Sequence, residues 1–278
     1  RNEIRELSAA PNWFITTASS PAIGQVDDSI ISNYELTKSS TLLDRYHAML
    51  LFQTTTSLPE MKGETFTGRD IVSLVLPPVS MVRAPEHYKS NYAQWVHYDP
   101  TEIKVRIEQG KVLSGILDKK SIGAGATGGL YHLIAADFGN RAAFDTIHAM
   151  QQVSLAYIMQ KGFTVGIMDL LLPDKSSEEI MRITSDMINK SLLLTERLRN
   201  GEIIPPVGDT MEDFYEKQQI SILSAFDDFS QPVISGINHN ANGLYRLYVS
   251  GSKGKDAQLF NMTSAGAQKQ INGERIRQ

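Results

Sequence analysis

The chain has 278 residues, of which 41% are apolar and 21% charged, a globular balance that excludes global disorder. Its net charge of −4 excludes a uniformly basic nucleic-acid coat, so any contact with nucleic acid requires a local basic patch. The absence of cysteine excludes disulfides, thiolate zinc sites and cysteine nucleophiles. We find no run of about 20 apolar residues and no signal peptide, and because the first residue is Arg1 we expect a fragment or a processed product.

Residues 1–135 have the pattern of a mixed, β-leaning structure. Residues 41–52 predict one short helix, and residues 71–76 (IVSLVL) form an apolar run that stops at two prolines, as a buried strand would. Residues 103–107 alternate apolar and polar side chains, which is the period of a half-buried strand. Residues 111–117 follow after Gln109–Gly110, which predicts a hairpin turn.

Residues 140–235 have a helical pattern. Residues 142–160 repeat apolar side chains at helical spacing and stop near Gly162, and the sequence SSEE at 176–179 predicts a capping box at the start of a long helix that ends at Gly201. Thr210-x-x-Asp213 predicts the start of a second helix, and the short polar link predicts an antiparallel hairpin. Each of the two helices has an apolar stripe, and we interpret both stripes as core packing. The stripe of the first helix is Ile180, Ile183, Met187, Leu194 and Leu198. The stripe of the second helix is Met211, Phe214, Tyr215, Ile222 and Phe226.

Charge is distributed unevenly along the chain. Residues 174–229 hold six basic and twelve acidic residues, a net charge of −6, whereas residues 236–278 hold six basic and two acidic residues, a net charge of +4. A basic segment therefore follows an acidic one, and the basic segment is the better candidate for a contact with phosphates.

The most specific local motif is Ser250-Gly-Ser-Lys-Gly254. Its small residues allow a close approach of the backbone to a ligand, and Lys253 adds an ammonium group suited to a phosphate. The spacing of a Walker A loop is absent, and a flexible surface turn is the alternative interpretation.

A second candidate places Lys119 and Lys120 before a glycine-rich bend at residues 123–129. A phosphate or RNA contact is one interpretation of this segment, and a solvated loop after a strand is the other.

The histidines and the acidic pairs give no sign of a metal site. No two of the six histidines have HxxxH or HExxH spacing, and we interpret His47 and His148 as core or surface residues. The neighbouring carboxylates at 178–179 and 227–228 point in different directions on a helix, so neither pair is a good clamp for two metals. No G-x-S-x-G nucleophile elbow occurs.

Taken together, six segments in order resemble the largest subunit of multisubunit DNA-directed RNA polymerases of the eukaryotic, archaeal or large-DNA-virus type. The match runs nearly from end to end, although Met168 and Leu170 replace smaller residues of the family pattern and Lys269 replaces the second of two glutamines. The six segments are residues 67–77, 115–123, 128–132, 162–169, 249–254 and 268–276.

The resemblance implies an α+β fold, and it implies that this chain corresponds to only one part of the subunit. Residues 1–37 resemble the tail of the active-site domain, residues 38–173 a mixed, β-rich pore domain, and residues 174–278 a funnel domain with an antiparallel helical hairpin that ends before the bridge helix. The family's catalytic Asp-x-Asp-x-Asp loop has no counterpart in the chain. The resemblance therefore implies that Mg²⁺ is bound outside this segment, that this chain binds no cofactor, and that alone it is inactive as a nucleotidyltransferase.

The implied function is the secondary channel, the route by which nucleoside triphosphates enter and backtracked RNA leaves during transcription. The residues that we expect to meet triphosphates or the RNA 3′ end are Lys253, Ser250, Ser252, Lys119, Lys120 and Gln268. The implied partners are the second-largest and other polymerase subunits, the DNA template through the whole enzyme, and a transcript-cleavage factor on the acidic hairpin, with no membrane. The implied location is nuclear or cytoplasmic, or a viral factory or virion if the chain is viral, and not secreted.

Two alternatives belong to other classes of function. One is a non-catalytic scaffold that binds a protein partner through the acidic helical hairpin. The other is a phosphate-binding enzyme built on the loop at residues 250–254. The ordered series of six motifs favours the polymerase interpretation over both.

Overall fold

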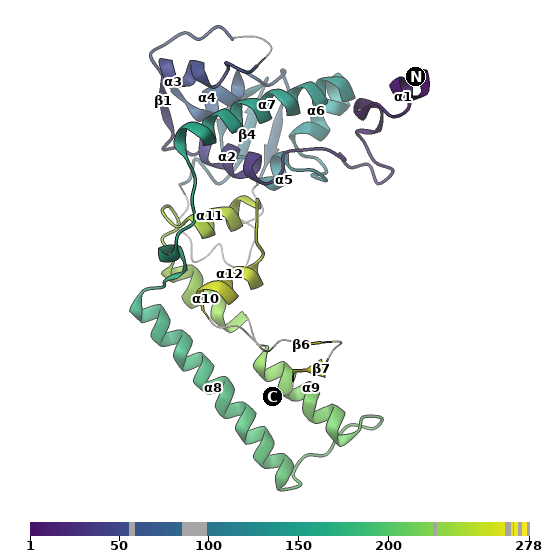
Figure 1. The fold of residues 1–278 in the computed structure, drawn as a ribbon, viewed down its shortest axis with the longest axis vertical. Coiled ribbons are helices and arrows are strands. Elements are labelled where there is room, and N and C mark those ends of the chain that lie inside the picture. The colour runs from purple at the N-terminus through teal and green to yellow at the C-terminus, as the bar shows by residue number, and fades with distance from the viewer. Residues whose placement is uncertain are drawn as a thin grey trace. The chain divides into compact units, whose positions relative to one another are not determined.

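A computed structural model describes residues 1–55, 59–84, 99–224, 227–264, 268, 270–271 and 274–276. The chain divides into two compact units, the first of residues 1–164 with 246–254 and the second of residues 165–245 with 255–278 (Figure 1). Helices and short antiparallel sheets occur together, which confirms the α+β class. The division into domains at residues 37 and 173 stays a prediction. Some residues of the sequence interpretation lie outside the described residues: His87, His97, Phe226, Lys269 and Gly273.

The first unit packs helices around two small sheets. Its core has α7 against α2 and α6, with Leu36, Ile107, Leu117 and Tyr131 almost completely buried. The helices are α1 (Asn2–Glu6), the 3-10 helix η1 (Ala10–Trp13), α2 (Asp28–Leu36), α3 (Arg45–Leu50), α4 (Gly68–Ser73), α5 (Lys119–Ile122), α6 (Leu130–Phe138) and α7 (Asn140–Lys161). The antiparallel sheets are β1 (Leu42–Asp44) with β2 (Thr65–Thr67), and β3 (Met81–Arg83), β4 (Val105–Glu108) and β5 (Lys111–Ser114) in that order.

The predicted strand at residues 71–76 is wrong, because this segment begins inside helix α4. A capping box starts the helix: the Asp70 amide donates to Thr67 Oγ1 at 3.2 Å, and the Thr67 amide donates to Asp70 Oδ2 at 2.8 Å. Ile71 and Val72 are fully buried from the helix. The cap at Thr67, four residues before the run begins, thus outweighs the β-branched composition of the run.

The predicted single helix at residues 41–52 is also wrong in its first part. Residues 42–44 form β1, and α3 begins only at Arg45, where the Asp44 carboxylate accepts a hydrogen bond from the His47 amide at 2.8 Å. Because aspartate favours the N-cap over the helix interior, it separates the strand from the helix.

The predicted hairpin and the predicted long helix of the first unit are confirmed, although β4 and β5 are shorter than the predicted strands at 103–107 and 111–117. The predicted β-leaning character of residues 1–135 is wrong, because helices hold more of the described residues there than strands do. Strands β4 and β5 pair as a hairpin. The turn residues Gln109 and Gly110 have φ angles of 47° and 78°, and a two-residue hairpin turn of type I′ requires positive φ at both positions. Helix α7 covers the predicted range and stops at Gly162, whose φ of 73° an L-residue rarely adopts.

The second unit contains the predicted helical hairpin, formed by α8 (Asp174–Arg199) and α9 (Met211–Leu223) (Figure 1). Thr210 caps α9 as predicted, with its side chain accepting from the Asp213 amide at 3.1 Å. The predicted capping box at residues 176–179 is wrong: α8 begins at Asp174 directly after Pro173, so both serines lie within its first turn. The remaining elements of the second unit are η4 (Ile167–Leu170), α10 (Asp227–Gly236), α12 (Asp256–Thr263), β6 (Gln270–Ile271) and β7 (Glu274–Arg275). Helix α11 (Gly243–Ser250) begins in the second unit and continues from Arg246 in the first.

Asp169, in the fourth of the six motifs, connects two segments of the second unit. Its carboxylate accepts from the amides of Gly166 at 2.9 Å and Gly243 at 3.0 Å, and its carbonyl oxygen accepts from the Asn242 side chain at 2.7 Å. The aspartate therefore shapes the turn at η4 and holds the start of α11 against it.

A polar network joins the two helices of the hairpin. Gln219 on α9 is 1% exposed; its Oε1 accepts from Ser191 Oγ on α8 at 2.6 Å, and its Nε2 donates to the Ser191 carbonyl oxygen at 3.1 Å and to Tyr215 Oη at 3.0 Å. A buried amide with this many partners fixes the register of one helix against the other.

We predict that Gln219→Ala destabilises the pairing of α8 and α9 by about 1–3 kcal/mol, since it leaves buried polar groups without partners. Hydrogen exchange followed by mass spectrometry should show faster exchange of the α8 and α9 amides. Gln218→Ala is the matched control, because Gln218 is exposed on the same helix. Equal exchange in the two variants would contradict the assignment.

Candidate functional site

The Ser250–Gly254 loop follows α11 and packs on the first unit. Ser250 is fully buried, and its Oγ donates to the Leu247 carbonyl at 3.0 Å and accepts from the Ser252 amide at 3.3 Å. Gly251 has a φ of 75°, and a Cβ there would lie 2.7 Å from Lys119 Cβ. Only glycine fits this backbone conformation and this close approach to α5.

Residue Asp27, which precedes α2, holds the other side of the loop. Ser252 Oγ donates to the Asp27 carbonyl oxygen at 2.6 Å, and Lys253 Nζ lies 2.8 Å from Asp27 Oδ2. Both serine hydroxyls of the motif are therefore engaged with the protein and set the shape of the loop. The Lys253 side chain is 64% exposed and reaches solvent.

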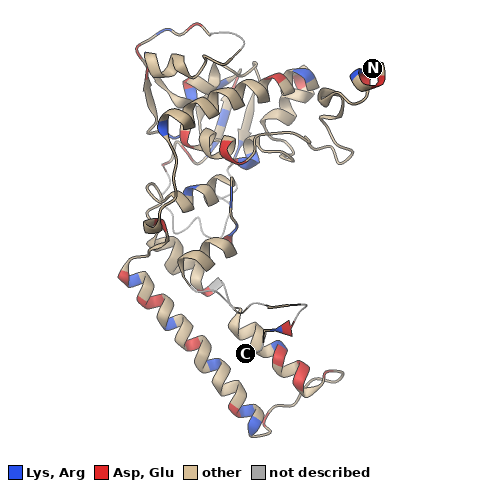
Figure 2. Ribbon diagram, in the orientation of Figure 1, with Lys and Arg blue, Asp and Glu red and all other residues tan. Residues whose placement is uncertain are grey.

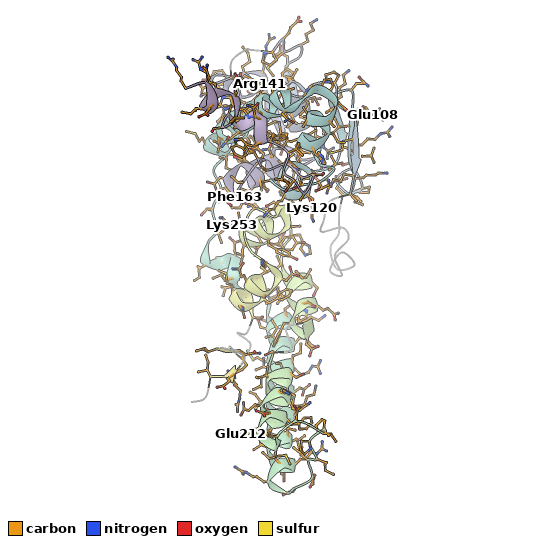
Figure 3. All side chains as sticks on the ribbon, turned by 90° about the vertical axis from the view of Figure 1, so that its right-hand side faces the viewer. Glu108, Lys120, Arg141, Phe163, Glu212 and Lys253 are labelled. Carbon is orange, nitrogen blue, oxygen red and sulfur yellow. The ribbon has the colours of Figure 1, made fainter. Side chains whose placement is uncertain are left out.

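Two more lysines lie next to this loop on α5. The Asp118 carboxylate caps this helix by accepting from the Ser121 amide at 3.0 Å, which places Lys119 and Lys120 in the first turn with both side chains exposed. Figure 3 shows Lys120 and Lys253 at the same end of the first unit. The structure thus brings together five of the six predicted site residues.

Glutamine 268, the sixth predicted residue, belongs to the second unit. Its amide donates to the Leu223 carbonyl oxygen at the end of α9 at 3.1 Å, and its side chain is half-buried. Its role in a channel stays a prediction.

The glycine-rich bend after α5 has a structural explanation. A Cβ at Gly24 would lie 2.4 Å from the Ala124 amide nitrogen, so the segment before α2 passes directly against residues 123–124. Gly128 has a φ of 66°, and its amide donates to Nδ1 of His132 at 2.9 Å. The glycines serve close backbone packing and the start of α6.

Sequence interpretation missed a buried charged cluster in the first unit. Glu35 on α2 is 1% exposed, and its carboxylate lies 3.0 Å from each of three cations: Lys38, Lys161 at the end of α7, and Arg246 on α11. The Arg246 guanidinium also lies over the ring of Phe163, 5.1 Å from its centroid. No local pattern marks Glu35, because the same helix also holds Asp28, Ser32 and Asn33.

These contacts shift the pKa values of the cluster. Burial disfavours the Glu35 carboxylate, but Lys38 and Lys161 more than offset this penalty, so the pKa of Glu35 lies below its ordinary value. Burial, together with the nearby Arg246 and Lys161, lowers the pKa of Lys38, although Glu35 opposes the shift. Burial also opposes the charge of Lys161, but hydrogen bonds to Tyr157 and Glu35 raise its pKa.

Neither a metal cluster nor a membrane span is found in the part of the chain that the structure describes. Within the described ranges, no three His, Asp or Glu side chains gather where they could hold a metal ion. None of the helices there has the length and apolar character that crossing a membrane requires.

Comparison with protein-family models matches residues 14–170 to the family described as RNA polymerase Rpb1, domain 3. The match covers more than half of the 278 residues. The chain belongs to this family. Membership confirms the resemblance to the largest subunit of DNA-directed RNA polymerases.

Curated relatives extend the match over the rest of the chain. Proteins of African swine fever virus described as "DNA-directed RNA polymerase RPB1 homolog" are 37% identical over 289 aligned residues, covering 99% of this chain and 20% of the relative. They include proteins of a South African tick isolate, a Namibian warthog isolate and the Badajoz strain. The chain thus spans about 20% of the length of these Rpb1 relatives.

We predict that Glu35→Gln lowers the free energy of unfolding of the first unit by about 3–5 kcal/mol at neutral pH, because three cations lose their shared carboxylate. Since the pKa of Glu35 is lowered on folding, its contribution is present above the ordinary value of 4.5 and is lost as the pH falls through the folded pKa. The difference between wild type and variant should therefore shrink in acid.

Urea unfolding at several pH values, followed by tryptophan fluorescence, measures this difference, since both tryptophans lie within residues 1–164. Glu108→Gln is the matched control: Glu108 pairs with Arg106 on the surface, where such a pair contributes about 0–1 kcal/mol. A loss for Glu35→Gln no larger than that of the control would show that the cluster does not hold the unit together.

Proposed function

We propose that this chain is the pore-and-funnel portion of the largest subunit of a DNA-directed RNA polymerase and forms part of the route for triphosphates and backtracked RNA. The observation that carries the proposal is the loop of residues 250–254, which presents the exposed Lys253 beside Lys119 and Lys120 in a chain of this family. Three exposed ammonium groups at one end of the first unit raise the local concentration of triphosphates by electrostatic attraction.

The division of labour within the loop supports this role. The hydroxyls of Ser250 and Ser252 hold the backbone, so Lys253 projects from a fixed loop with a side chain that is 64% exposed. Its partner Asp27 has a 53% exposed side chain, and such a solvated ion pair exchanges at little cost for a phosphate oxygen. The loop thus attracts phosphates and releases them again, as a passage requires.

Catalysis itself lies elsewhere in this proposal. Nucleotidyl transfer uses two metal ions that stabilise the attacking and leaving oxygens. We assign Mg²⁺ and its aspartate ligands to other parts of the enzyme. The partners of the whole enzyme are then the second-largest and other subunits and the DNA template. On this view the isolated chain is inactive.

We predict that Lys253→Gln in the assembled polymerase raises the KM for triphosphates several-fold and slows cleavage of backtracked transcripts, with a weaker dependence of both on salt. Single-turnover elongation and cleavage assays at two ionic strengths measure these effects. Lys111→Gln, an exposed lysine on β5, is the matched control. Unchanged KM and cleavage in Lys253→Gln would rule out the route at this loop.

The acidic hairpin supports a second element of the proposal, the docking of a transcript-cleavage factor. Figure 2 shows acidic and basic positions alternating along α8 and mainly acidic positions on α9, and residues 174–223 together hold ten acidic and six basic residues, a net charge of −4. This negative charge repels RNA and favours a basic protein surface. The exposed Met181, Ile188 and Leu192 on α8 add apolar area for such a contact.

We predict that replacing residues 202–208, the link between α8 and α9, by a short Gly-Ser linker abolishes factor-stimulated cleavage and leaves elongation unchanged. The measurement is cleavage of a stalled transcript with and without the factor. Factor-stimulated cleavage at the wild-type rate would refute docking at the hairpin tip.

A further inference from the structure

Among the residues that the structure describes, strand β1 pairs only with β2. At one end of this ladder the Gly68 amide donates to the Thr41 carbonyl oxygen at 3.3 Å, and at the other end the Arg45 amide donates to the Glu64 carbonyl oxygen at 2.9 Å. Backbone groups alternate in direction along an antiparallel strand, so those of residues 41, 43 and 45 point toward β2. The opposite side of β1 is a sheet edge.

Leu42 and Asp44 present their backbone groups at this edge. The two amides and the Leu42 carbonyl oxygen have no hydrogen-bond partner within the described ranges. A row of unpaired amides and carbonyl oxygens of this kind is a template on which an extended segment can pair. The edge of β1 is therefore able to accept a further strand.

The side chains beside this edge are apolar and accessible. Leu42 is 69% exposed, and Tyr46 in the first turn of α3 is 68% exposed. The ring of Tyr46 lies edge-on to that of His47, with 5.4 Å between the centroids. Single exposed apolar residues are ordinary on a protein surface, but these border a cleft.

The cleft has a volume of about 340 Å³ and lies between β1 and the end of α7. It is lined by Ser40, Thr41, Leu42, Leu43 and His47 on one side and by Tyr157, Gln160 and Lys161 on the other. Its volume is at the lower end of the range of about 300–1,000 Å³ that is usual for ligand sites, so it has room for a large side chain. Leu43 and the ring of Tyr157 supply apolar walls for such a side chain.

An extended peptide satisfies the edge and the cleft together. Its backbone would pair with Leu42 and Asp44, and because side chains alternate along a strand, one of them would enter the cleft. A helix uses its own backbone groups internally, and a small molecule in the cleft would leave the edge unpaired. Since β1 is short, backbone pairing alone would hold a partner weakly, and the side chain in the cleft would supply the specificity.

We propose that β1 accepts an extended segment of another polymerase subunit as an added strand, with one large apolar side chain of that segment between Leu43 and Tyr157. The choice of a subunit as the partner rests on the proposed function, in which this chain is assembled with other subunits. The surface shares no residue with the loop at residues 250–254 or with the α8–α9 hairpin, so it is separate from both the proposed route and the proposed factor site.

Hydrogen exchange of the assembled native enzyme, resolved to single amides by mass spectrometry, tests the pairing. We expect the Leu42 and Asp44 amides to exchange at least about tenfold more slowly than in an unstructured peptide, because both would donate to the added strand. The Leu43 amide faces β2 and should be slow in any case, which shows that β1 is folded. Exchange of Leu42 and Asp44 at the unstructured rate beside a slow Leu43 would overturn the proposal.

Photo-crosslinking of the assembled enzyme identifies the occupant. Benzoylphenylalanine is placed at Ser40 or at Leu42, and mass spectrometry maps the residues to which each becomes linked. We expect both to reach one segment of one other subunit, at positions about two residues apart, as an added strand requires. Leu113, which is 49% exposed on β5 and does not line the cleft, is the control and should not reach that segment. Links to scattered positions, to nucleic acid or to another part of this chain would each refute the proposal.

A matched pair of variants tests the cleft. Gln160→Trp adds a bulky ring to the wall of the cleft, and Gln151→Trp makes the same change at an exposed position of α7 that does not line it. We expect the crosslink yield from position 42 to fall at least about fivefold with Gln160→Trp and to stay unchanged with Gln151→Trp. Equal yields would show that no side chain occupies the cleft.

Co-purification of this chain with the other polymerase subunits reports separately on the proposed function. If the subunits co-purify and the Leu42 amide is unprotected, only the added strand is refuted. If no other subunit co-purifies, the proposed function fails, and the added strand, which depends on it for its partner, fails with it.

Discussion

The first unit depends on one buried carboxylate. Glu35 is held by cations from three separate segments: Lys38 after α2, Lys161 at the end of α7 and Arg246 on α11. A buried glutamate is tolerated only when its charge is paired, so these segments must meet at this point for the unit to form. The separation of 211 positions along the sequence makes the pair of Glu35 and Arg246 the longest-range ion pair of the cluster.

The position of the Ser250–Gly254 loop follows from this constraint. Arg246 begins the stretch 246–254, which returns to the first unit after the chain has formed most of the second. Four residues beyond Arg246, Ser250 begins the turn that sets Gly251 against Lys119 and Ser252 against Asp27. The ion pair of Arg246 with Glu35 thus holds the segment before the loop, and the contacts of Gly251 and Ser252 hold the loop itself. Lys253 therefore projects from a backbone that is held in place.

Features with strong local signals could be predicted from the sequence, and features decided by distant contacts could not. The α8–α9 hairpin, the cap at Thr210 and the turn at Gln109–Gly110 depend on neighbouring residues, and all three are confirmed. Residues 71–76 have the composition of a strand, yet the cap at Thr67 starts a helix there. The role of Glu35 depends on Lys161 and Arg246, whose positions no local pattern reveals. In the loop, the motif predicted Lys253 as a phosphate ligand, but the use of both serine hydroxyls as internal contacts required the structure.

The net charge of −4 is a poor guide to the surface of the first unit because many of its carboxylates are already engaged. Asp44, Asp70 and Asp118 accept hydrogen bonds from the first turns of α3, α4 and α5, where the helix dipole stabilises their charge. Glu35 is buried, while Lys119, Lys120 and Lys253 remain exposed. Residues 174–229 of the second unit alone have a net charge of −6, so they account for the negative charge of the chain. Several carboxylates of the first unit thus serve as helix caps or as ion-pair centres, while the three lysine side chains lie at the surface. In the proposed function, these exposed lysines are what allows a chain of net negative charge to meet phosphates.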